Sequence, residues 1–432
     1  MKLLVIGGGG REHALAWKLS CSPRVQKVFV APGNGGTARD KRYVNISYQS
    51  NEALADFARS EGVAFTVVGP EAPLASGVVD VFRARGLRIF GPTQAAAQLE
   101  SSKDFAKAFM TRHGIPTAAY RTFSNAEAAR DYVRQRGAPI VVKADGLAAG
   151  KGVVVAATVQ EAIAAIDAML GGATAGDDAK VVIEEFLTGE EASFIVMCDG
   201  KSVLTLATSQ DHKRLLDNDR GPNTGGMGAY SPAPIISPTV HAKVLREVIM
   251  PTITGMAADG IPFSGFLYAG LMIAPDGDVK TLEFNCRMGD PEAQVILMRM
   301  KSDLVPLLDA AIDGRLDQVE AQWDRRTALG VVIASHGYPD HPRRGDRVTH
   351  LAGDDDDCMT FHAGTELVDS ALVAVGGRVM CVTALAETVR AAQKRAYDAV
   401  DEVAFDGMQF RRDIGFRALK PRAPAIVHAD PL

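Results

Sequence analysis

Two polar side chains at the end of one predicted strand, Glu283 and Asn285, have the chemistry of a metal site. The turn at residues 274–278 predicts a hairpin with strands at residues 266–273 and 279–285. Because side chains alternate along a strand, both groups are expected on the same face. Mg²⁺ takes oxygen ligands, often one or two from protein and the rest from water and phosphates. The pair favours a metal-nucleotide site, although an amphipathic edge strand with polar groups facing water would show the same pattern.

A glycine-rich turn has a lysine at each end, Lys143 and Lys151. It joins two β-rich runs, so it is expected to be the tip of a hairpin. It is not the usual P-loop, because Gly146 to Gly150 is one residue too short and Gly152 follows the second lysine. We interpret it as a lid whose amides and lysines cover phosphates. The alternative is a plain glycine hairpin.

Two further stretches add groups that a bound nucleotide would use. Arg287 lies just beyond the metal strand, where its guanidinium is a fork for anions. Residues 181–187 read as an apolar strand that breaks into two acids, Glu184 and Glu185, before a tight turn. Such a strand end can supply a backbone hinge for the edge of adenine, although alone it is unremarkable.

The N-terminus predicts a strand at residues 2–6, a turn of four glycines and then a helix. This arrangement presents backbone N–H groups to a phosphate. A dinucleotide site is less favoured, because Glu12 or His13 stands where the third glycine of G-x-G-x-x-G belongs. The next strand, residues 28–31, also lacks the acid that would hold an adenosine ribose. A small phosphate ligand fits this pattern better.

Strands and helices alternate through the first hundred residues, which predicts a parallel sheet with helices on both faces. Residues 70–77 are expected to form a loop at the sheet edge where ligands gather. Glu71 in this loop can hold sugar hydroxyls, or it is a solvated loop acid. Further along, residues 239–256 predict one long helix, and the strand pattern resumes after residue 327. The fold class is therefore α/β with a β-rich C-terminal part.

Length and composition limit the functional classes. At 432 residues, the chain is expected to contain roughly three domains. A net charge of -5 gives no electrostatic footprint for nucleic acid. No run of 18 apolar residues and no signal peptide is visible, so we expect a cytoplasmic protein without membrane contact. The five scattered cysteines favour reduced thiols over disulfides or a zinc site.

Several of these motifs together resemble the ATP-grasp superfamily. They are the two lid lysines, Glu-Glu-Phe-Leu at 184–187, Pro-Asn-Thr-Gly-Gly-Met-Gly at 222–228 and Glu-x-Asn-x-Arg at 283–287. Four longer stretches resemble the phosphoribosylamine–glycine ligase (glycinamide ribonucleotide synthetase) family of purine biosynthesis. These are Gly-Gly-Gly-Gly-Arg-Glu-His at 7–13, Val-Gly-Pro-Glu-Ala-Pro-Leu at 68–74, the lysine-flanked turn at 143–152 and Phe-Asn-Cys-Arg-Met-Gly-Asp-Pro-Glu at 284–292. The resemblance covers nearly the whole chain.

The resemblance implies a ligase that forms a C–N bond between glycine and 5-phosphoribosylamine. ATP would first phosphorylate glycine, and the amine would then displace phosphate, with Mg²⁺ or Mn²⁺ as the metal. It also implies an N-terminal α/β domain over 1–100, an ATP-grasp domain over 101–326 with a lid at about 119–187, and a C-terminal domain over 327–432. The expected assembly is a monomer or a small homo-oligomer.

The resemblance assigns roles to individual residues. Glu283 and Asn285 would bind the metal, and Arg287, Lys143 and Lys151 would be catalytic. The ATP-binding set would be Lys103, Lys143, Gly146, Gly150, Lys151, Gly152, Glu184, Glu185, Leu187 and Glu191. The set for the other substrates would be Gly8, Gly9, Gly10, Arg11, Asn34, Gly35, Gly36, Glu71, Asp211, Lys213 and Arg287.

Two other functions share part of this pattern. An ATP-dependent carboxylase would keep the ATP-grasp but should handle biotin or bicarbonate, and no biotin-accepting Met-Lys context is present in the chain. A non-catalytic nucleotide-binding module would need neither Arg287 nor the N-terminal glycine loops. ATP hydrolysis with glycine and phosphoribosylamine present or omitted distinguishes the three.

Overall fold

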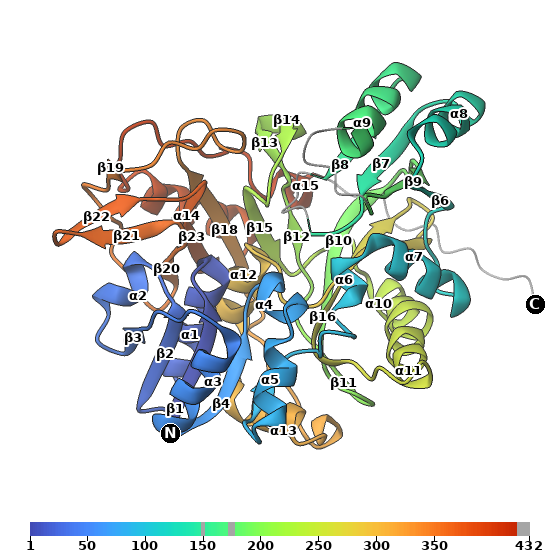
Figure 1. Ribbon diagram of the computed structural model, residues 1–432. Coiled ribbons are helices and arrows are strands. Elements are labelled where there is room, and N and C mark those ends of the chain that lie inside the picture. The colour runs from blue at the N-terminus through green and yellow to red at the C-terminus, as the bar shows by residue number, and fades with distance from the viewer. Residues whose placement is uncertain (148–151, 172–177, 421–432) are drawn as a thin grey trace, which may run out of the picture.

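The computed structural model describes residues 1–147, 152–171 and 178–420. Its N-terminal part is a five-stranded sheet in which every pair is parallel, as the alternation predicts (Figure 1). In spatial order the strands are β3 (Tyr43–Asn45), β2 (Lys27–Pro32), β1 (Lys2–Gly7), β4 (Val63–Val68) and β5 (Ile89–Phe90). The helices are α1 (Gly10–Ser20), α2 (Gly35–Arg39), α3 (Asn51–Ser60), α4 (Glu71–Ala75) and α5 (Val78–Ala84). Strands β1, β2 and β4 are almost entirely buried because helices cover both faces.

The predicted loop at residues 70–77 is wrong, because its first half is helix α4. Pro70 has extended backbone and takes the N-cap position, and Pro73 falls within the first turn, where a missing N–H costs no helical hydrogen bond. Glu71 is the first helical residue, so its acid lies at the positive end of the helix. The helix thus fixes the place of Glu71 at the sheet edge.

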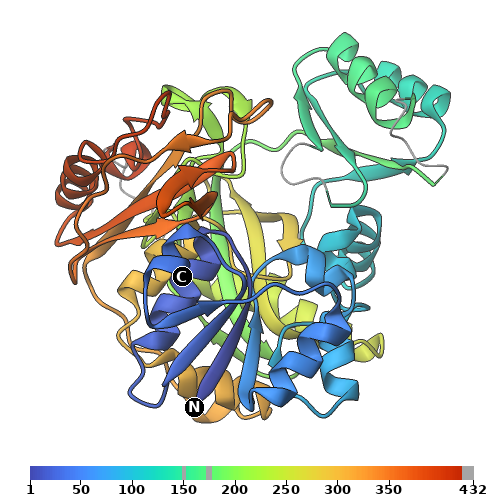
Figure 2. The ribbon, with the colours of Figure 1, turned by 60° about the vertical axis from the view of Figure 1, so that its left-hand side comes forward.

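The lysine-flanked turn belongs to a separate α/β unit, which stands apart from the remainder of the molecule in Figure 2. A broken helix, α6 (Gln98–Ser101) and α7 (Lys103–Arg112), leads to this unit, and the Ser102 side chain caps α7. The strands in spatial order are β6 (Tyr120–Phe123), β9 (Val181–Glu185), β7 (Ile140–Ala144) and β8 (Val153–Ala156), with helices α8 (Ala126–Arg136) and α9 (Val159–Gly171). β7 and β8 are antiparallel, so the predicted hairpin is confirmed.

The central sheet contains the predicted metal hairpin. Its strands in spatial order are β11 (Val203–Thr205), β10 (Glu190–Asp199), β16 (Ser264–Ile273) and β17 (Val279–Asn285). Helices α12 (Glu292–Arg299) and α13 (Leu304–Ile312) follow it. The predicted helix over 239–256 consists of three parts, α10 (Pro238–Val244), a π-helical turn (Leu245–Ile249) and α11 (Met250–Ala258). Pro251 has no N–H for the preceding turn, and the wider π turn accommodates that missing donor.

The C-terminal sheet contains strands from both sides of residue 326. In spatial order they are β12 (Gln210–Asp211), β15 (Gly228–Ser231), β18 (Thr327–Ala334), β23 (Arg378–Ala386) and β20 (Cys358–His362). A smaller sheet contains β19 (Asp346–Arg347), β22 (Ala371–Ala374) and β21 (Thr365–Val368), and helix α14 (Val389–Val400) packs on the larger one. A short hairpin, β13 (Arg214–Leu216) and β14 (Arg220–Asn223), lies between β12 and β15, and α15 (Phe416–Leu419) follows α14. Among the helices within the described ranges, none is long and apolar enough to cross a bilayer.

Two buried histidines join the N-terminal and C-terminal parts. The backbone N–H of His362, on β20, donates to Nδ1 of His13, on α1, at 2.9 Å. Burial lowers the pKa of His13 to about 4 and that of His362 to about 3. Both imidazoles are therefore neutral in the folded protein at pH 7, and this contact holds two regions together without charge.

Burial of His13 in its neutral form should make the protein less stable in mild acid. Below pH 6.5 the unfolded chain binds a proton at His13 that the folded chain does not, so the free energy of unfolding falls as pH drops toward 4. The expected loss at pH 5 is about 2 kcal/mol for this residue. His13→Asn keeps an acceptor near Nδ1 and should flatten the pH dependence of urea unfolding between pH 7 and 5 by about that amount. An unchanged slope would mean that His13 titrates normally in the folded state.

Candidate active site

Glu283 and Asn285 lie on β17 with their carboxylate and amide on the same face, as strand alternation predicts. In the neighbouring strand β16, Gly270 pairs with Glu283, and Tyr268 pairs with Asn285. A Cβ on Gly270 would lie 3.3 Å from Cγ of Glu283, so the glycine keeps the space beside this carboxylate free of a side chain. Phe284 points to the opposite side and is buried in the core.

Lysines from three distant parts of the chain act electrostatically on the Glu283 carboxylate: Lys103 on α7, Lys143 on β7, and Lys213 just after β12. Burial raises the pKa of Glu283, but Lys213, Lys143 and Lys103 lower it more, and the result lies below the ordinary value. The carboxylate is therefore ionised at neutral pH, in the positive field of these lysines. This field suits the phosphates of a nucleotide with its metal.

The base of the lid is tied to the start of α7. Nζ of Lys103 donates to the carbonyl of Gly146 at 2.8 Å, and its backbone N–H donates to the Asp145 carboxylate at 2.6 Å. Gly146 has a φ of +97°, which a residue with a side chain adopts only with strain. The carbonyl of Gly152 accepts from Ala144, which closes the described part of the hairpin. Gly150 and Lys151 lie outside the described residues.

The predicted adenine segment is the end of β9. The Glu184 carboxylate is buried and forms ion pairs of 2.8 Å with both Lys107 and Lys143. Glu185 is exposed, pairs with Lys280 at 2.7 Å, and donates its backbone N–H to the carbonyl of Ala119. Leu187 lies beyond the strand and is partly buried. Ion pairs of Glu184 and Glu185 thus fix the end of β9.

A second charged cluster contains Glu191, Asp211 and Lys213. The Lys213 ammonium lies 2.8 Å from the Glu191 carboxylate. Burial raises the pKa of Asp211 to about 7, with the attraction of Lys213 opposing it and the repulsion of Glu292 and Glu191 adding to it. Asp211 can therefore exchange a proton near neutral pH.

Arg287 lies just after β17 and joins it to the N-terminal part. Its guanidinium lies 2.8 Å from the Glu100 carboxylate and 3.1 Å from that of Glu71. Burial alone would lower the pKa of Arg287, but these two acids raise it above its ordinary value. Arg11 lies beside them, because it donates to the carbonyl of Met288 at 3.0 Å. The predicted substrate residues Arg11, Glu71 and Arg287 therefore meet at one place.

The N-terminal glycines are closely packed. A Cβ on Gly8 would lie 2.5 Å from the carbonyl oxygen of Gly33, and one on Gly10 would lie 2.6 Å from the Gln294 amide nitrogen. Gly9 donates its N–H to the Glu12 carboxylate at 2.6 Å. The first and second glycine loops thus approach each other and α12 more closely than side chains would allow.

The second loop packs against the C-terminal strands. Asn34 accepts from the amides of Gly36 and Thr37 and donates to the carbonyls of Gly8 and His362, so its side chain is occupied within the protein. Cβ atoms on Gly35 and Gly36 would collide with Leu372 and His362 respectively. The role of these loops in binding a phosphate stays a prediction.

The sequence interpretation missed several charged residues of this region. Glu100 pairs with Arg287, Lys107 pairs with Glu184, and Glu292 accepts from Tyr268 at 2.8 Å. Lys107 had a detectable signal, because it lies one helical turn after Lys103 and thus on the same face of α7. Glu100 and Glu292 carried no such signal, since their partners are distant in the sequence.

The donor set fits a hard divalent cation. Glu283 would supply a charged oxygen and Asn285 a neutral one, and neither side chain carries sulfur or imidazole. Within the parts of the chain that the structure describes, no three His, Cys, Asp or Glu residues gather into a metal site. A cation with two protein ligands needs further oxygens from phosphates and water, which is how Mg²⁺ is usually bound in nucleotide sites.

A lysine-flanked hairpin facing a carboxylate–amide strand defines the ATP-grasp class. Two solved biotin carboxylases share this fold. The biotin carboxylase domain of the Hydrogenobacter thermophilus 2-oxoglutarate carboxylase has a TM-score of 0.71 at 15% identity and covers 94% of this chain and 91% of its own. The enzyme from Campylobacter jejuni has a TM-score of 0.72 at 14% identity, covering 94% and 92%.

The chain belongs to the phosphoribosylglycinamide synthetase family. The family's N domain matches residues 1–100, its ATP-grasp (A) domain residues 101–293 and its C domain residues 328–417. A phosphoribosylamine–glycine ligase of Ralstonia nicotianae is 68% identical over 97% of this chain and all of its own length. One of Neisseria meningitidis is 60% identical over the same shares. The crystal structure of the Thermotoga maritima ligase has a TM-score of 0.84 at 34% identity, covering 96% of this chain and all of its own.

Proposed function

We propose that this protein joins glycine to 5-phosphoribosylamine, with ATP converted to ADP and phosphate, in purine biosynthesis. Family membership supports the reaction. The single structural observation that carries it is the placement of Lys143, which donates to the carbonyl of Leu282 at 3.2 Å and so lies beside Glu283 and Asn285 of β17. A carboxylate is a poor electrophile, so ligation needs an activated intermediate, and this group of charges suits transfer of a phosphoryl group.

In the first step, a carboxylate oxygen of glycine attacks the γ-phosphorus of ATP. The new O–P bond gives glycyl phosphate, and the bond to ADP breaks. Lys103 and Lys143 would stabilise negative charge on the transferred group and on ADP. A divalent cation held by Glu283 and Asn285 would supply further charge neutralisation.

In the second step, the amine of phosphoribosylamine attacks the acyl carbon and phosphate leaves. The attacking nitrogen must lose a proton, and Asp211 has a pKa suited to accept it. Arg287, with Lys213 beside the same site, would hold the acyl phosphate and the departing phosphate. The backbone amides at residues 8–11 would hold the phosphate of the ribose.

The remaining residues are assigned to the nucleotide. The end of β9, with Glu184 and the backbone of Glu185 and Leu187, would contact adenine. Glu191 would contact the ribose. Gly146 and Gly152, with Gly150 and Lys151 outside the described residues, would form the lid. We propose domain limits at residues 100 and 326, with the lid at about 119–187.

The metal would be Mg²⁺ or Mn²⁺, and the protein would act in the cytoplasm as a monomer or a small homo-oligomer, without nucleic acid. Its five cysteines are free, in keeping with a reducing compartment.

The direct test measures phosphate release from ATP with each substrate present or omitted. We expect release only when ATP, glycine and phosphoribosylamine are all supplied, with one glycinamide product formed per phosphate. Bicarbonate in place of glycine should give no release. Substantial turnover with bicarbonate would instead indicate a carboxylase, and nucleotide binding without turnover would indicate a binding module.

A substitution at Gly9 tests whether the N-terminal glycine loops and the ATP-grasp part serve different steps of the reaction. A side chain there would start 2.8 Å from the Glu12 carboxylate and 3.5 Å from that of Asp290, and would fill the space beside the loop amides. Gly9→Val should lower overall ligation by more than about tenfold, since it would block close approach of a phosphate. Glycine-dependent isotope exchange within ATP, which reports reversible formation of glycyl phosphate, should be retained. Circular dichroism must show that the variant is folded. Loss of both activities together would refute this division between the loops and the ATP-grasp.

A further inference from the structure

Lys107 has no part in the proposed chemistry, yet it is almost completely buried near Lys143, which is proposed to bind ATP. Its side chain is 2% exposed, and Nζ lies 2.8 Å from one carboxylate oxygen of Glu184. The other oxygen of Glu184 lies 2.8 Å from Nζ of Lys143. Two lysines therefore share one buried carboxylate.

This cluster is anchored to the metal strand on both sides. Lys107 donates to the Thr117 hydroxyl at 2.8 Å, and that hydroxyl donates to the carbonyl of Thr281 at 2.7 Å. Lys143 donates to the carbonyl of Leu282 at 3.2 Å. The lysines thus hold β7 and β9 against the strand residues that precede Glu283.

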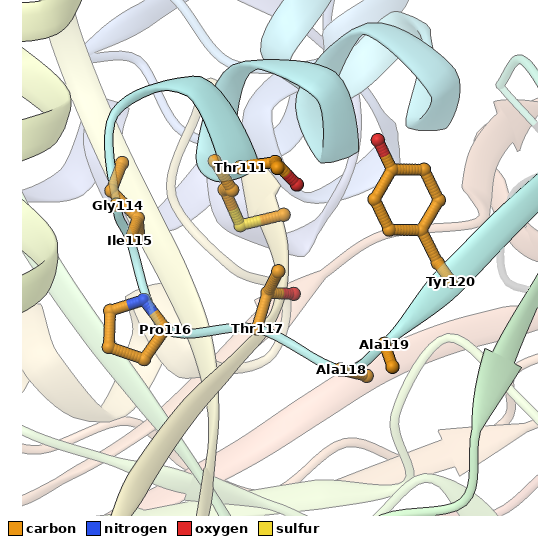
Figure 3. A pocket seen from close by; sticks show the side chains of 9 residues that line it. Thr111, Gly114, Ile115, Pro116, Thr117, Ala118, Ala119 and Tyr120 are labelled. Carbon is orange, nitrogen blue, oxygen red and sulfur yellow. The ribbon is translucent and has the colours of Figure 1, made fainter.

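Thr117 lies in the linker that connects α7 to β6, beside a hollow of about 520 Å³ (Figure 3). Tyr120 is the first residue of β6, directly after this linker. The Lys107 ammonium lies 5.7 Å from the centroid of the Tyr120 ring. A cation over an aromatic face is stabilised without being neutralised. The ammonium of Lys107 is therefore supported by an acid, a hydroxyl and a ring.

The charges of the cluster determine what Lys143 offers to a ligand. With Lys107 present, two ammonium groups and one carboxylate give a net charge of one positive unit. Without Lys107, Lys143 and Glu184 would form a neutral pair, and the attraction of Lys143 for a phosphate would be largely offset by its own partner.

We propose that Lys107 is a positioning residue for the triphosphate: it balances the charge of Glu184 and so keeps that of Lys143 available to the phosphates. This inference rests on the proposed function, because it takes Lys143 as a ligand of ATP. Lys107 acts only through its neighbours and does not touch the nucleotide.

The experiment measures binding of ATP and of adenosine to the full-length protein by competition with a fluorescent nucleotide. Lys107→Met should weaken ATP binding by about tenfold or more, because one charge-assisted contact is lost. Adenosine binding should change by less than about threefold, because Glu184 keeps its ion pair with Lys143 and adenosine has no phosphate to sense the missing charge. Lys107→Arg should restore most of the ATP affinity.

Two control variants separate charge from geometry. Thr117→Val removes the hydroxyl partner of Lys107 but keeps the charge, so ATP affinity should stay close to that of the wild type. Lys18→Met removes one positive charge from α1, where the ammonium donates to a backbone carbonyl, and should likewise leave ATP affinity unchanged.

A pH series gives a readout that a merely structural lysine would not produce. The groups that face Lys107 are Glu184 and Glu185 on β9, Lys143 on β7, Thr117 and Tyr120. Burial lowers the pKa of Lys107 to about 8, with the attraction of Glu184 opposing it and the repulsion of Lys143 adding to it. As pH rises through 8, Lys107 loses its proton and wild-type affinity for ATP should fall. Lys107→Arg stays charged and should fall less.

Several outcomes would overturn the inference. They are wild-type ATP affinity in folded Lys107→Met, a parallel loss of adenosine and ATP binding, and a loss in Thr117→Val as large as in Lys107→Met. If Lys107→Met does not fold, identical pH profiles for the wild type and Lys107→Arg would overturn it. A wild-type protein that binds no ATP would refute the proposed function itself, which is a separate result.

Discussion

Glu283→Gln should lower the rate of ATP-dependent ligation by on the order of 10²-fold or more, while the protein stays folded. Glutamine keeps the shape of the side chain but removes its charge, and Glu283 is the one carboxylate in the proposed metal site. The lysines that act electrostatically on Glu283 would also lose the attraction of its charge, so repulsion among them would rise. The measurement is kcat and KM for ATP across a Mg²⁺ titration, with the denaturation midpoint as the check on folding.

Asp278→Asn is the matched control, because it removes one negative charge from the turn of the same hairpin. Its carboxylate pairs with Lys243 at the surface, away from the site. This variant should keep wild-type activity. Normal turnover of Glu283→Gln at low Mg²⁺ would show that the metal is bound elsewhere.

Arg287→Lys should lower kcat by on the order of 10²-fold with a much smaller change in KM for ATP. Lysine keeps the charge, but a single ammonium cannot reproduce the planar fork that spans Glu71 and Glu100. One of these acids would lose its direct partner, and the cation proposed to hold the acyl phosphate would lose its orientation. The measurement is steady-state kinetics with glycine and with ATP varied separately.

Arg315→Lys provides the comparison for Arg287→Lys, because Arg315 is an exposed arginine that pairs with Asp313. It should have no effect on rate. If folded Arg287→Lys retained kcat within a few-fold of the wild type, Arg287 would serve to hold the N-terminal part in place rather than to bind the reacting groups.

Strand β17 was predictable because its signals are local. A hairpin turn and the alternation of side chains suffice to put Glu283 and Asn285 on one face, and the structure confirms both the hairpin and the shared face. The alternation of strands and helices likewise predicted the parallel N-terminal sheet. In these cases each inference depends on residues within a few positions of one another.

The surroundings of that strand were not predictable from local pattern. Lys103, Lys143 and Lys213 come from three separate elements, and only the family resemblance brought them together before the structure did. Glu100 meets Arg287 across nearly two hundred residues, and no periodicity marks such a pair. Helix α4 was missed although its two prolines, Pro70 and Pro73, occupy positions that a helix tolerates.

The glycine loops show how one residue type serves two purposes. Four consecutive glycines predicted a phosphate site, and that role stays a prediction. The same glycines are also required by packing, since a Cβ on Gly8 would collide with the Gly33 carbonyl. Sequence alone does not separate these two causes.

The shared C-terminal sheet has a consequence for how the chain is made. Strand β15 pairs with β18, and residues 228–231 leave the ribosome well before residues 327–334. At synthesis rates of about 5 to 20 residues per second, the β15 edge waits roughly 5 to 20 seconds for its partner. During that interval its unpaired backbone groups are open to pairing with other nascent chains. Ribosome stalling between these two strands should therefore yield aggregating or protease-sensitive chains, whereas release of the complete chain should not, because β18 then also has its partner β23.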